Sequence, residues 1–301
     1  MKTTAYDIIE NQDLGGKAFF FTGGYAGLGA INTKALLMAN AKVIITGRSA
    51  KAQAEFVQQL RDDSELNYED QQVDASHTLD LGDLESVKNF AYYIKENYNQ
   101  IDCLINNAGV MNTPPGKTKD GFETQMGINV VGHFLLSKIL VDITRRQIWL
   151  SSKGHIRFGA PRIDLEAITN VDEATYVPRS RYQQAKLGDI LLAKQFAKQY
   201  PHLKAVSVHP GGVKTNLARH MTLGQKMKFI LTNPFMVMSM VSPEEGAATQ
   251  VMVSTIPDEE LSNGAYYSDC KMTEEAQSAR NMEDAKKLFD YCDKVTKAYQ
   301  S

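Results

Sequence analysis

Residues 17–29 read KAFFFTGGYAGLG, and this stretch decides the fold. Its apolar part, residues 18–21, is typical of a buried strand, and a turn with the spacing T-G-x-x-x-G-x-G follows directly. Residues 30–38 then favour a helix. We expect a phosphate-binding turn, because glycine backbone approaches a pyrophosphate closely and a helix N-terminus offers free N–H groups. The alternative is a glycine-rich turn that binds nothing.

The second predicted strand, residues 41–46, ends at Gly47 and Arg48. In dinucleotide-binding folds an acidic residue at this position binds the ribose hydroxyls of NAD. Arginine instead offers a fork of donors that suits a 2′-phosphate. The alternative is an ordinary surface arginine. The sequence therefore predicts NADP(H) as the cofactor, in preference to NAD(H).

Composition excludes several other classes of protein. The chain has 301 residues, 43% of them hydrophobic, so it can bury one large core, although its length would also permit two domains. A net charge of -2 draws it neither to nucleic acid nor to anionic lipid. No apolar stretch is long enough to span a bilayer, and the polar N-terminus is unlike a signal peptide. Three scattered cysteines form no C-x-x-C pair, which speaks against a metal site and favours a reduced, cytoplasmic protein.

Strand-like and helix-like segments alternate along the chain, which is typical of βαβ units. The prediction is therefore an α/β fold with a doubly wound parallel sheet of the Rossmann type, in a single domain over residues 1–301. We expect further strands at residues 77–81, 101–105, 148–150 and 205–208 and helices at 50–68, from 83, at 121–141 and from 182, with a loop at 153–180.

Polar or small residues stand at the predicted carboxyl ends of the strands, where ligands bind in such sheets. They are Asp80 and Leu81, the NNAG stretch at 106–109, the pair Ser151 and Ser152, and the turn at 210–212. The asparagines could also form a plain turn, because asparagine tolerates unusual dihedral angles. We interpret His133, on the helix after NNAG, as a packed helix residue.

Tyr182 and Lys186 are four positions apart and share one face of the helix predicted from residue 182. A pair at this spacing is common and carries little information alone. The order of the signals is more specific: the glycine turn, NNAG, Asn129, Ser152, the Tyr182/Lys186 pair and the HPGG turn at 209–212. Together they resemble the short-chain dehydrogenase/reductase family, nearly from end to end.

Within that family the chain is most similar to the retinol dehydrogenase-like and WW-domain oxidoreductase branch. Segments 243–247, 264–270 and 278–281 support this placement. The resemblance implies a sheet of about seven strands. It also implies that Tyr182 donates a proton to a carbonyl oxygen, with a pKa lowered by Lys186. Ser152 would orient the substrate oxygen, and Asn129 would hold a water that links Lys186 to solvent.

The resemblance also implies a set of residues around the cofactor. Gly23, Gly27 and Gly29 would lie against its phosphates, Arg48 would bind the 2′-phosphate, and Lys186 would hold the nicotinamide ribose. The remaining expected contacts are Tyr25, Leu28, Asp80, Leu81, Asn107, Ala108, Gly109, Tyr182, Pro210, Gly211, Val213 and Thr215.

Some features depart from the family pattern. Ser152 and Tyr182 are 30 residues apart, a long gap whose residues around 156–178 would form a flap on the substrate side. Trp149 stands where a small aliphatic residue is usual, and either Ser151 or Ser152 could face the cleft. Residues 221–240 are rich in Met and Phe and would belong to a substrate lid at about 216–242. A core or dimer contact and a membrane-surface helix are the alternatives for this segment.

We therefore predict an NADP(H)-dependent oxidoreductase that interconverts a carbonyl and an alcohol on a small apolar substrate. The alternatives are reduction of a carbon–carbon double bond by the same pair, and a cofactor-bound regulator with little turnover. By analogy with the family, a homodimer would form through the helices at roughly 122–140 and 182–199. We expect no nucleic-acid partner, no resident metal and at most peripheral contact with a membrane.

Overall fold

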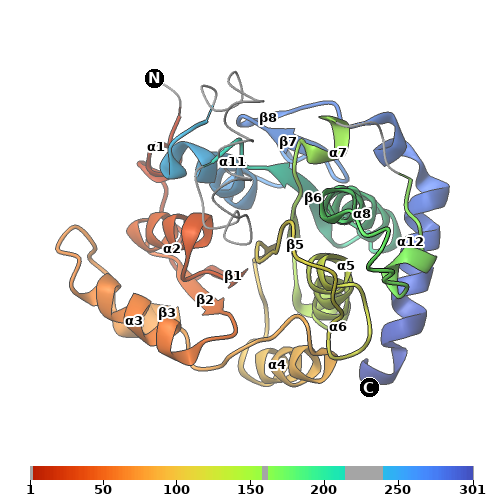
Figure 1. Ribbon diagram of the computed structural model, residues 1–301. Helices are drawn as coiled ribbons and strands as arrows, with labels where there is room; N and C mark the ends of the chain where they lie inside the picture. Colours follow the sequence, from red (N-terminus) through yellow and green to blue (C-terminus); the bar gives the residue numbers. More distant parts are fainter. Residues whose placement is uncertain (1–2, 158–161, 214–239, 301) are drawn as a thin grey trace.

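The computed structural model describes residues 3–157, 162–213 and 240–300, and these form one eight-stranded sheet with helices on both faces (Figure 1). The strand order is β3-β2-β1-β4-β5-β6-β7-β8, and all neighbours are parallel except β7 and β8. The strands are β1 (Ala18–Thr22), β2 (Lys42–Thr46), β3 (Val73–Asp74), β4 (Cys103–Asn106), β5 (Arg146–Leu150), β6 (Lys204–His209), β7 (Tyr266–Ser268) and β8 (Lys271–Met272). The strand order reverses between β1 and β4, so the predicted doubly wound fold is confirmed.

The two faces of the sheet bury separate apolar clusters, because successive side chains of a strand point to opposite sides. Phe20 of β1 belongs to one cluster, and its neighbours Phe19 and Phe21 belong to the other. The cluster of Phe20 packs under α4 (Leu84–Asn97), α6 (His133–Ile139), α8 (Pro178–Gln199) and α12 (Met282–Thr296). The other packs under α1 (Ala5–Ile9), α2 (Gly27–Met38), α3 (Ala50–Arg61) and α11 (Pro243–Thr255).

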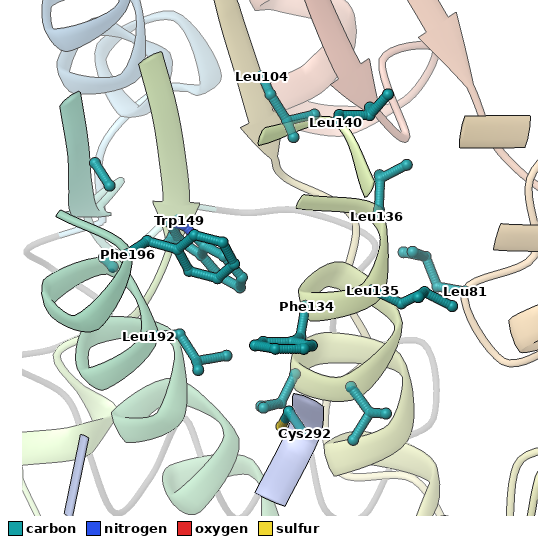
Figure 2. Packing of buried hydrophobic residues seen from close by; sticks show 14 of the residues in the cluster. Leu81, Leu104, Phe134, Leu135, Leu136, Leu140, Trp149, Leu192, Phe196 and Cys292 are labelled. Atoms are coloured by element: carbon teal, nitrogen blue, oxygen red, sulfur yellow. The ribbon is translucent and has the colours of Figure 1, made fainter. Parts of the chain in front are cut away.

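Large aromatic side chains fill the space between β5, α6 and α8 (Figure 2). The rings of Trp149 and Phe196 have centroids 5.6 Å apart, and Phe134 lies 5.7 Å from Phe196. On the outer side Phe289 of α12 meets both phenylalanines edge-on, at 5.0 and 5.2 Å. The large Trp149 therefore packs in the helix layer and does not reach the carboxyl edge of the sheet.

Helix α12 covers α6 and α8 within the same chain (Figure 1). These are the helices through which the family analogy predicted a homodimer. Most side chains of α8 between Tyr182 and Phe196 are buried without any second copy of the protein. The dimer stays a prediction, and the face of α8 against α12 is already occupied.

The predicted strand at 77–81 is wrong. Strand β3 is residues 73–74, and the chain then runs irregularly beside the end of β2. Side chains donate hydrogen bonds to the backbone carbonyls of this segment. Gln53 donates to the carbonyls of Ala75 and His77, and Thr46 also donates to the carbonyl of His77. A regular ladder therefore stops at Asp74.

Three helical segments also differ from their predicted bounds. The helix expected at 50–68 is α3, which ends at Arg61. The single helix expected at 121–141 consists of α5 (Thr124–Met126), a π-helical segment (Gly127–Gly132) and α6. The expected loop at 153–180 contains α7 (Gly154–Arg157) and a 3-10 turn (Glu166–Ile168), and α8 begins at Pro178, before Tyr182. The other 3-10 turns among the described residues are Asp70–Gln72, Val141–Ile143, Gln277–Arg280 and Lys297–Tyr299.

The predicted lid and Thr215 fall largely on residues that the structure does not describe. Most of the predicted lid, residues 214–239, lies outside the described residues, as does Thr215. Among the residues that the structure describes, no helix combines the length and apolarity needed to cross a membrane. Nor does the described part of the chain contain a group of three or more His, Cys, Asp or Glu that could hold a metal ion.

Candidate active site

The glycine turn between β1 and α2 has the shape of a phosphate cradle. Gly23 and Gly27 have positive φ angles, of 68° and 54°, which favour glycine. A Cβ at Gly29 would lie 2.3 Å from the carbonyl oxygen of Gly23, so close packing of turn and helix also requires glycine. The residue before α2, Ala26, offers no side-chain cap, which leaves the first N–H groups of the helix free. The turn therefore fits a pyrophosphate group.

The end of β2 fits a cofactor that carries an extra phosphate. The Tyr25 ring lies over Gly47, where an added Cβ would be 2.4 Å from Tyr25 Cε1. Any side chain at position 47 would require the Tyr25 ring to move. Arg48 follows and is exposed at the same edge of the sheet.

Asn107 ties the NNAG stretch to the glycine turn. Its Nδ2 donates to the carbonyl oxygen of Thr22 at 2.8 Å, and its Oδ1 accepts from Nε2 of Gln250 at 3.3 Å. Gln250 of α11 in turn accepts from Asn32 of α2 at 3.0 Å. The predicted asparagine is thus part of a chain of amides, and its partner Gln250 was missed by the sequence analysis.

The turn after β6 reaches the same edge of the sheet. Gly211 in this turn has a φ of 90°. A Cβ added at Gly246 would lie 2.2 Å from Val213, 3.1 Å from the carbonyl oxygen of Pro210 and 3.3 Å from Leu28. These predicted cofactor contacts therefore surround Gly246 at the start of α11.

Asp80 and Leu81 lie in the irregular segment after β3. Asp80 accepts from the backbone N–H of Gly82 at 2.9 Å, and its own N–H donates to Ser86 Oγ at 3.0 Å. Leu81 is buried against α6 and the π-helical segment, where a Cβ at Gly132 would be 2.4 Å from the Leu81 carbonyl oxygen. The leucine therefore supports the helix layer.

Tyr182 and Lys186 lie on one face of α8, beside the end of β5. Lys186 Nζ is 5.8 Å from the centroid of the Tyr182 ring, and both side chains are buried. Burial raises the pKa of Tyr182 above its usual value, while the Lys186 cation and a hydrogen bond from Ser152 lower it and Asp189 raises it. The lowering effect predicted for Lys186 is present, and burial outweighs it.

The two serines after β5 have different surroundings. Ser151 is buried and its hydroxyl donates to the backbone carbonyl of Lys186 at 2.6 Å. Ser152 is half-buried and accepts from the N–H of Gly154 at 3.1 Å. Its Oγ and Tyr182 Cε1 lie 3.4 and 3.8 Å from a Cβ added at Gly154, and its hydroxyl lowers the pKa of Tyr182. Of the two, Ser152 therefore lies beside the phenol, and Ser151 anchors the strand end to α8.

Asn129 lies in the π-helical segment, facing the loop after β4. Its side chain both donates to and accepts from the backbone of Val110, at 3.0 and 2.9 Å. A Cβ at Gly109 would be 3.2 Å from Asn129 Oδ1 and 3.9 Å from Lys186 Nζ. The structure thus brings Asn129, Gly109 and Lys186 together.

Thr22 and His133 form a buried link that the sequence analysis missed. Thr22 Oγ1 accepts from the backbone N–H groups of Asn107 and Ala108, at 3.0 and 2.9 Å. With both lone pairs engaged, the hydroxyl donates to Nε2 of His133 at 2.9 Å. The Nδ1–H of His133 then donates to the carbonyl oxygen of Asn129 at 3.0 Å. Burial lowers the pKa of His133 to about 3, so the ring is neutral.

Comparisons with known proteins identify relatives of this chain. A family model described as short chain dehydrogenase matches residues 17–159. Retinol dehydrogenase 14 of Mus musculus is 33% identical over 292 residues, which cover 91% of this chain and 84% of that protein. The chloroplastic short-chain dehydrogenase TIC 32 A of Brassica napus is 31% identical over 313 residues, covering 98% and 93%.

A solved structure of an uncharacterized protein from Mycobacterium Paratuberculosis has a TM-score of 0.76 at 25% identity, and the match covers 99% of this chain and 98% of that one. The similarity thus includes both the glycine turn and the helix that carries Tyr182 and Lys186. The chain belongs to the short-chain dehydrogenase/reductase family, in its retinol dehydrogenase-like branch.

Proposed function

We propose that the protein is an NADP(H)-dependent oxidoreductase that interconverts a carbonyl and an alcohol. The observation that carries this proposal is the position of the Tyr182 phenol. It lies beside the Ser152 hydroxyl, one helical turn from the Lys186 ammonium, near the carboxyl end of β5. A phenol held between a hydroxyl and a cation is suited to proton transfer.

The residues of the chain can carry out the steps that accompany hydride transfer. When bound, the nicotinamide cofactor supplies or accepts the hydride. Tyr182 donates a proton to the carbonyl oxygen in reduction, and accepts one from the alcohol in oxidation. Ser152 donates a hydrogen bond to the same oxygen and so stabilises the charge that develops on it. Lys186 stabilises the phenolate, and Asn129, close to Lys186, supports return of the proton from solvent.

The preference for NADP(H) rests on Tyr25, Gly47 and Arg48. Gly47 offers no carboxylate for the ribose hydroxyls, the Tyr25 ring lies against it, and Arg48 offers an exposed guanidinium immediately after it. A guanidinium can bind a phosphate through two parallel hydrogen bonds. The free helix N-terminus at the glycine turn supports binding of the pyrophosphate that both cofactors share.

We propose an apolar alcohol or aldehyde as the substrate, because the mouse relative is named for retinol, an apolar alcohol. The cytoplasm is the location that we propose from the balanced charge and the scattered cysteines. The Brassica relative is chloroplastic, so fractionation of cells must test this location separately.

The test is NADPH consumption with a panel of apolar aldehydes, ketones and enones. We expect the wild-type protein to reduce an aldehyde or ketone, and Tyr182→Phe to lose activity by a factor on the order of 10² to 10⁴ while it still binds NADPH. Tyr92→Phe is the matched control, because the Tyr92 hydroxyl donates to the backbone carbonyl of Gln300, far from the proposed site in the described part of the chain. Full activity in Tyr182→Phe would refute the mechanism.

A further inference from the structure

Lys186 forms a buried ion pair with an acid on its own helix. Its Nζ donates to Asp189 Oδ2 at 2.8 Å and to the backbone carbonyl of Leu150 at 2.6 Å. The side chains of the pair are only 7% and 3% exposed. A carboxylate that is almost fully buried thus lies against the lysine that the proposed function places next to the proton donor.

Stability alone gives little reason for a carboxylate at this position. Removal of two charges from water costs free energy that their attraction only partly recovers, and an apolar pair of similar volume is often as stable. Burial raises the pKa of Asp189 to about 6, and the attraction of Lys186 opposes the rise. The charge nevertheless has an effect at the site, because it acts on both Lys186 and Tyr182.

The first effect is on the position of the ammonium. Lys186 has three N–H donors, and the Leu150 carbonyl and Asp189 take two of them. Only one donor is left for the side of the site where Gly109 lies. The carboxylate therefore fixes the direction in which Lys186 can act.

The second effect is on the phenol. Burial has the largest effect and raises the pKa of Tyr182; Lys186 lowers this pKa and the Asp189 carboxylate raises it, so the two charges partly cancel. Three buried histidines also lie in this region, His133 of α6, His155 of α7 and His209 of β6. Burial lowers the pKa of each, to about 3 for His133 and His209, so none carries a charge at neutral pH. Among the described residues, Lys186 and Asp189 are thus the charged groups that act on the phenol.

We propose that Asp189 is a positioning residue that holds Lys186 in place and limits the effect of the Lys186 charge on Tyr182. Alcohol oxidation needs the phenolate of Tyr182 to accept a proton, so Asp189 shifts the onset of oxidation to higher pH. The link to oxidation rests on the proposed function. The effect of Asp189 on the ionisation of Tyr182 does not depend on turnover.

The deciding experiment measures the ionisation of Tyr182 directly. The near-ultraviolet absorbance of phenolate is recorded against pH, with and without NADP⁺, and the curve of the matching Tyr182→Phe protein is subtracted. In Asp189→Asn, which keeps an oxygen acceptor for Lys186 but removes the charge, we expect phenolate at lower pH than in the wild type. At a fixed pH below the midpoint the phenolate fraction should rise on the order of threefold to tenfold.

Two variants provide matched controls. Asp189→Glu restores the charge and should bring the phenolate curve back toward that of the wild type. Asp258→Asn also removes the carboxylate partner of a buried cation, Arg146, at the opposite edge of the sheet, and should leave the curve unchanged. If Asp189→Asn does not fold, Asp189→Ser provides a second uncharged side chain.

Alcohol oxidation gives an independent readout. In Asp189→Asn the rise of kcat/KM with pH should move to lower pH in parallel with the phenolate curve. An unshifted phenolate curve in the uncharged variants would overturn the role of Asp189. A shifted curve in a protein that turns over no carbonyl or alcohol would support the effect on Tyr182 and refute the proposed function.

Discussion

Arg48 is the residue whose single side chain should select between the two nicotinamide cofactors. We expect Arg48→Ala to raise the Kd for NADPH by a factor on the order of 10 to 100, because a charge-assisted bond to the 2′-phosphate is lost. The Kd for NADH, which lacks this phosphate, should change less than about threefold. Fluorescence titration with both cofactors measures the two effects.

Lys51→Ala is the control for this experiment, because Lys51 is an exposed cation in the first turn of α3, just after Arg48. Its loss should affect both cofactors alike. Equal losses of NADPH and NADH affinity in Arg48→Ala would show that the arginine does not select the cofactor.

Among single residues, the sequence identified those that stand in a recognisable order and spacing. It missed those whose role depends on contacts with residues far away in the sequence. Ser152, Tyr182 and Lys186 could be named from order and spacing, and the structure brings them together. Asp189 and His133 look like ordinary helix residues in the sequence. Their contacts depend on how distant segments meet.

The π-helical segment is the element that joins the predicted relay residue Asn129 to the cofactor side of the sheet, through His133 and Thr22. The unfolded chain takes up a proton at this histidine near pH 6.5, whereas burial lowers the pKa in the folded protein to about 3. The contribution of the neutral His133 to the free energy of unfolding is therefore complete above pH 6.5. It is lost as the pH falls from 6.5 towards 3.

We expect His133→Gln to reduce the slope of unfolding free energy against pH by up to about 1.4 kcal/mol per pH unit, between about pH 4 and 6. Denaturant titrations at several pH values measure this slope. His209→Gln should give a similar reduction, because burial also lowers the pKa of His209 to about 3. An unchanged slope in His133→Gln would mean that this histidine does not stay neutral in the folded protein.

At the scale of elements, the alternation of strands and helices was readable because apolar runs and glycine turns are local signals. The predicted β1 and β2 and the helix of Tyr182 were found close to their expected places. The strand expected at 77–81 was wrong, because side chains of Gln53 and Thr46 satisfy the carbonyls there. Periodicity alone also could not show that residues 127–132 adopt π-helical bonding.

At the scale of the whole molecule, α12 completes the layer that supports the proposed active site. Phe289 packs against Phe134 of α6 and Phe196 of α8, the helix that also carries Tyr182. We expect Phe289→Ala to destabilise the protein by about 3–5 kcal/mol, because a large buried ring leaves a cavity. Urea unfolding measures the loss.

Lys287→Ala on the same helix is the control, because its exposed side chain pairs with Glu283 at the surface. This change should stay within about 0.5 kcal/mol of the wild type. A loss below about 1 kcal/mol in Phe289→Ala would show that α12 does not seal the core over α6 and α8.

The late position of α12 in the sequence has a consequence for synthesis. The ribosome makes β1 to β8 and every other described α-helix before residues 282–296. Until α12 is made, the apolar side of α8 that packs against it stays exposed. The helix that carries Tyr182 and Lys186 then lacks part of its packing. Such surfaces are the ones that chaperones bind and that aggregate when left open. The proposed active site is therefore fully supported only after residues 282–296 have been made and α12 has packed on α6 and α8.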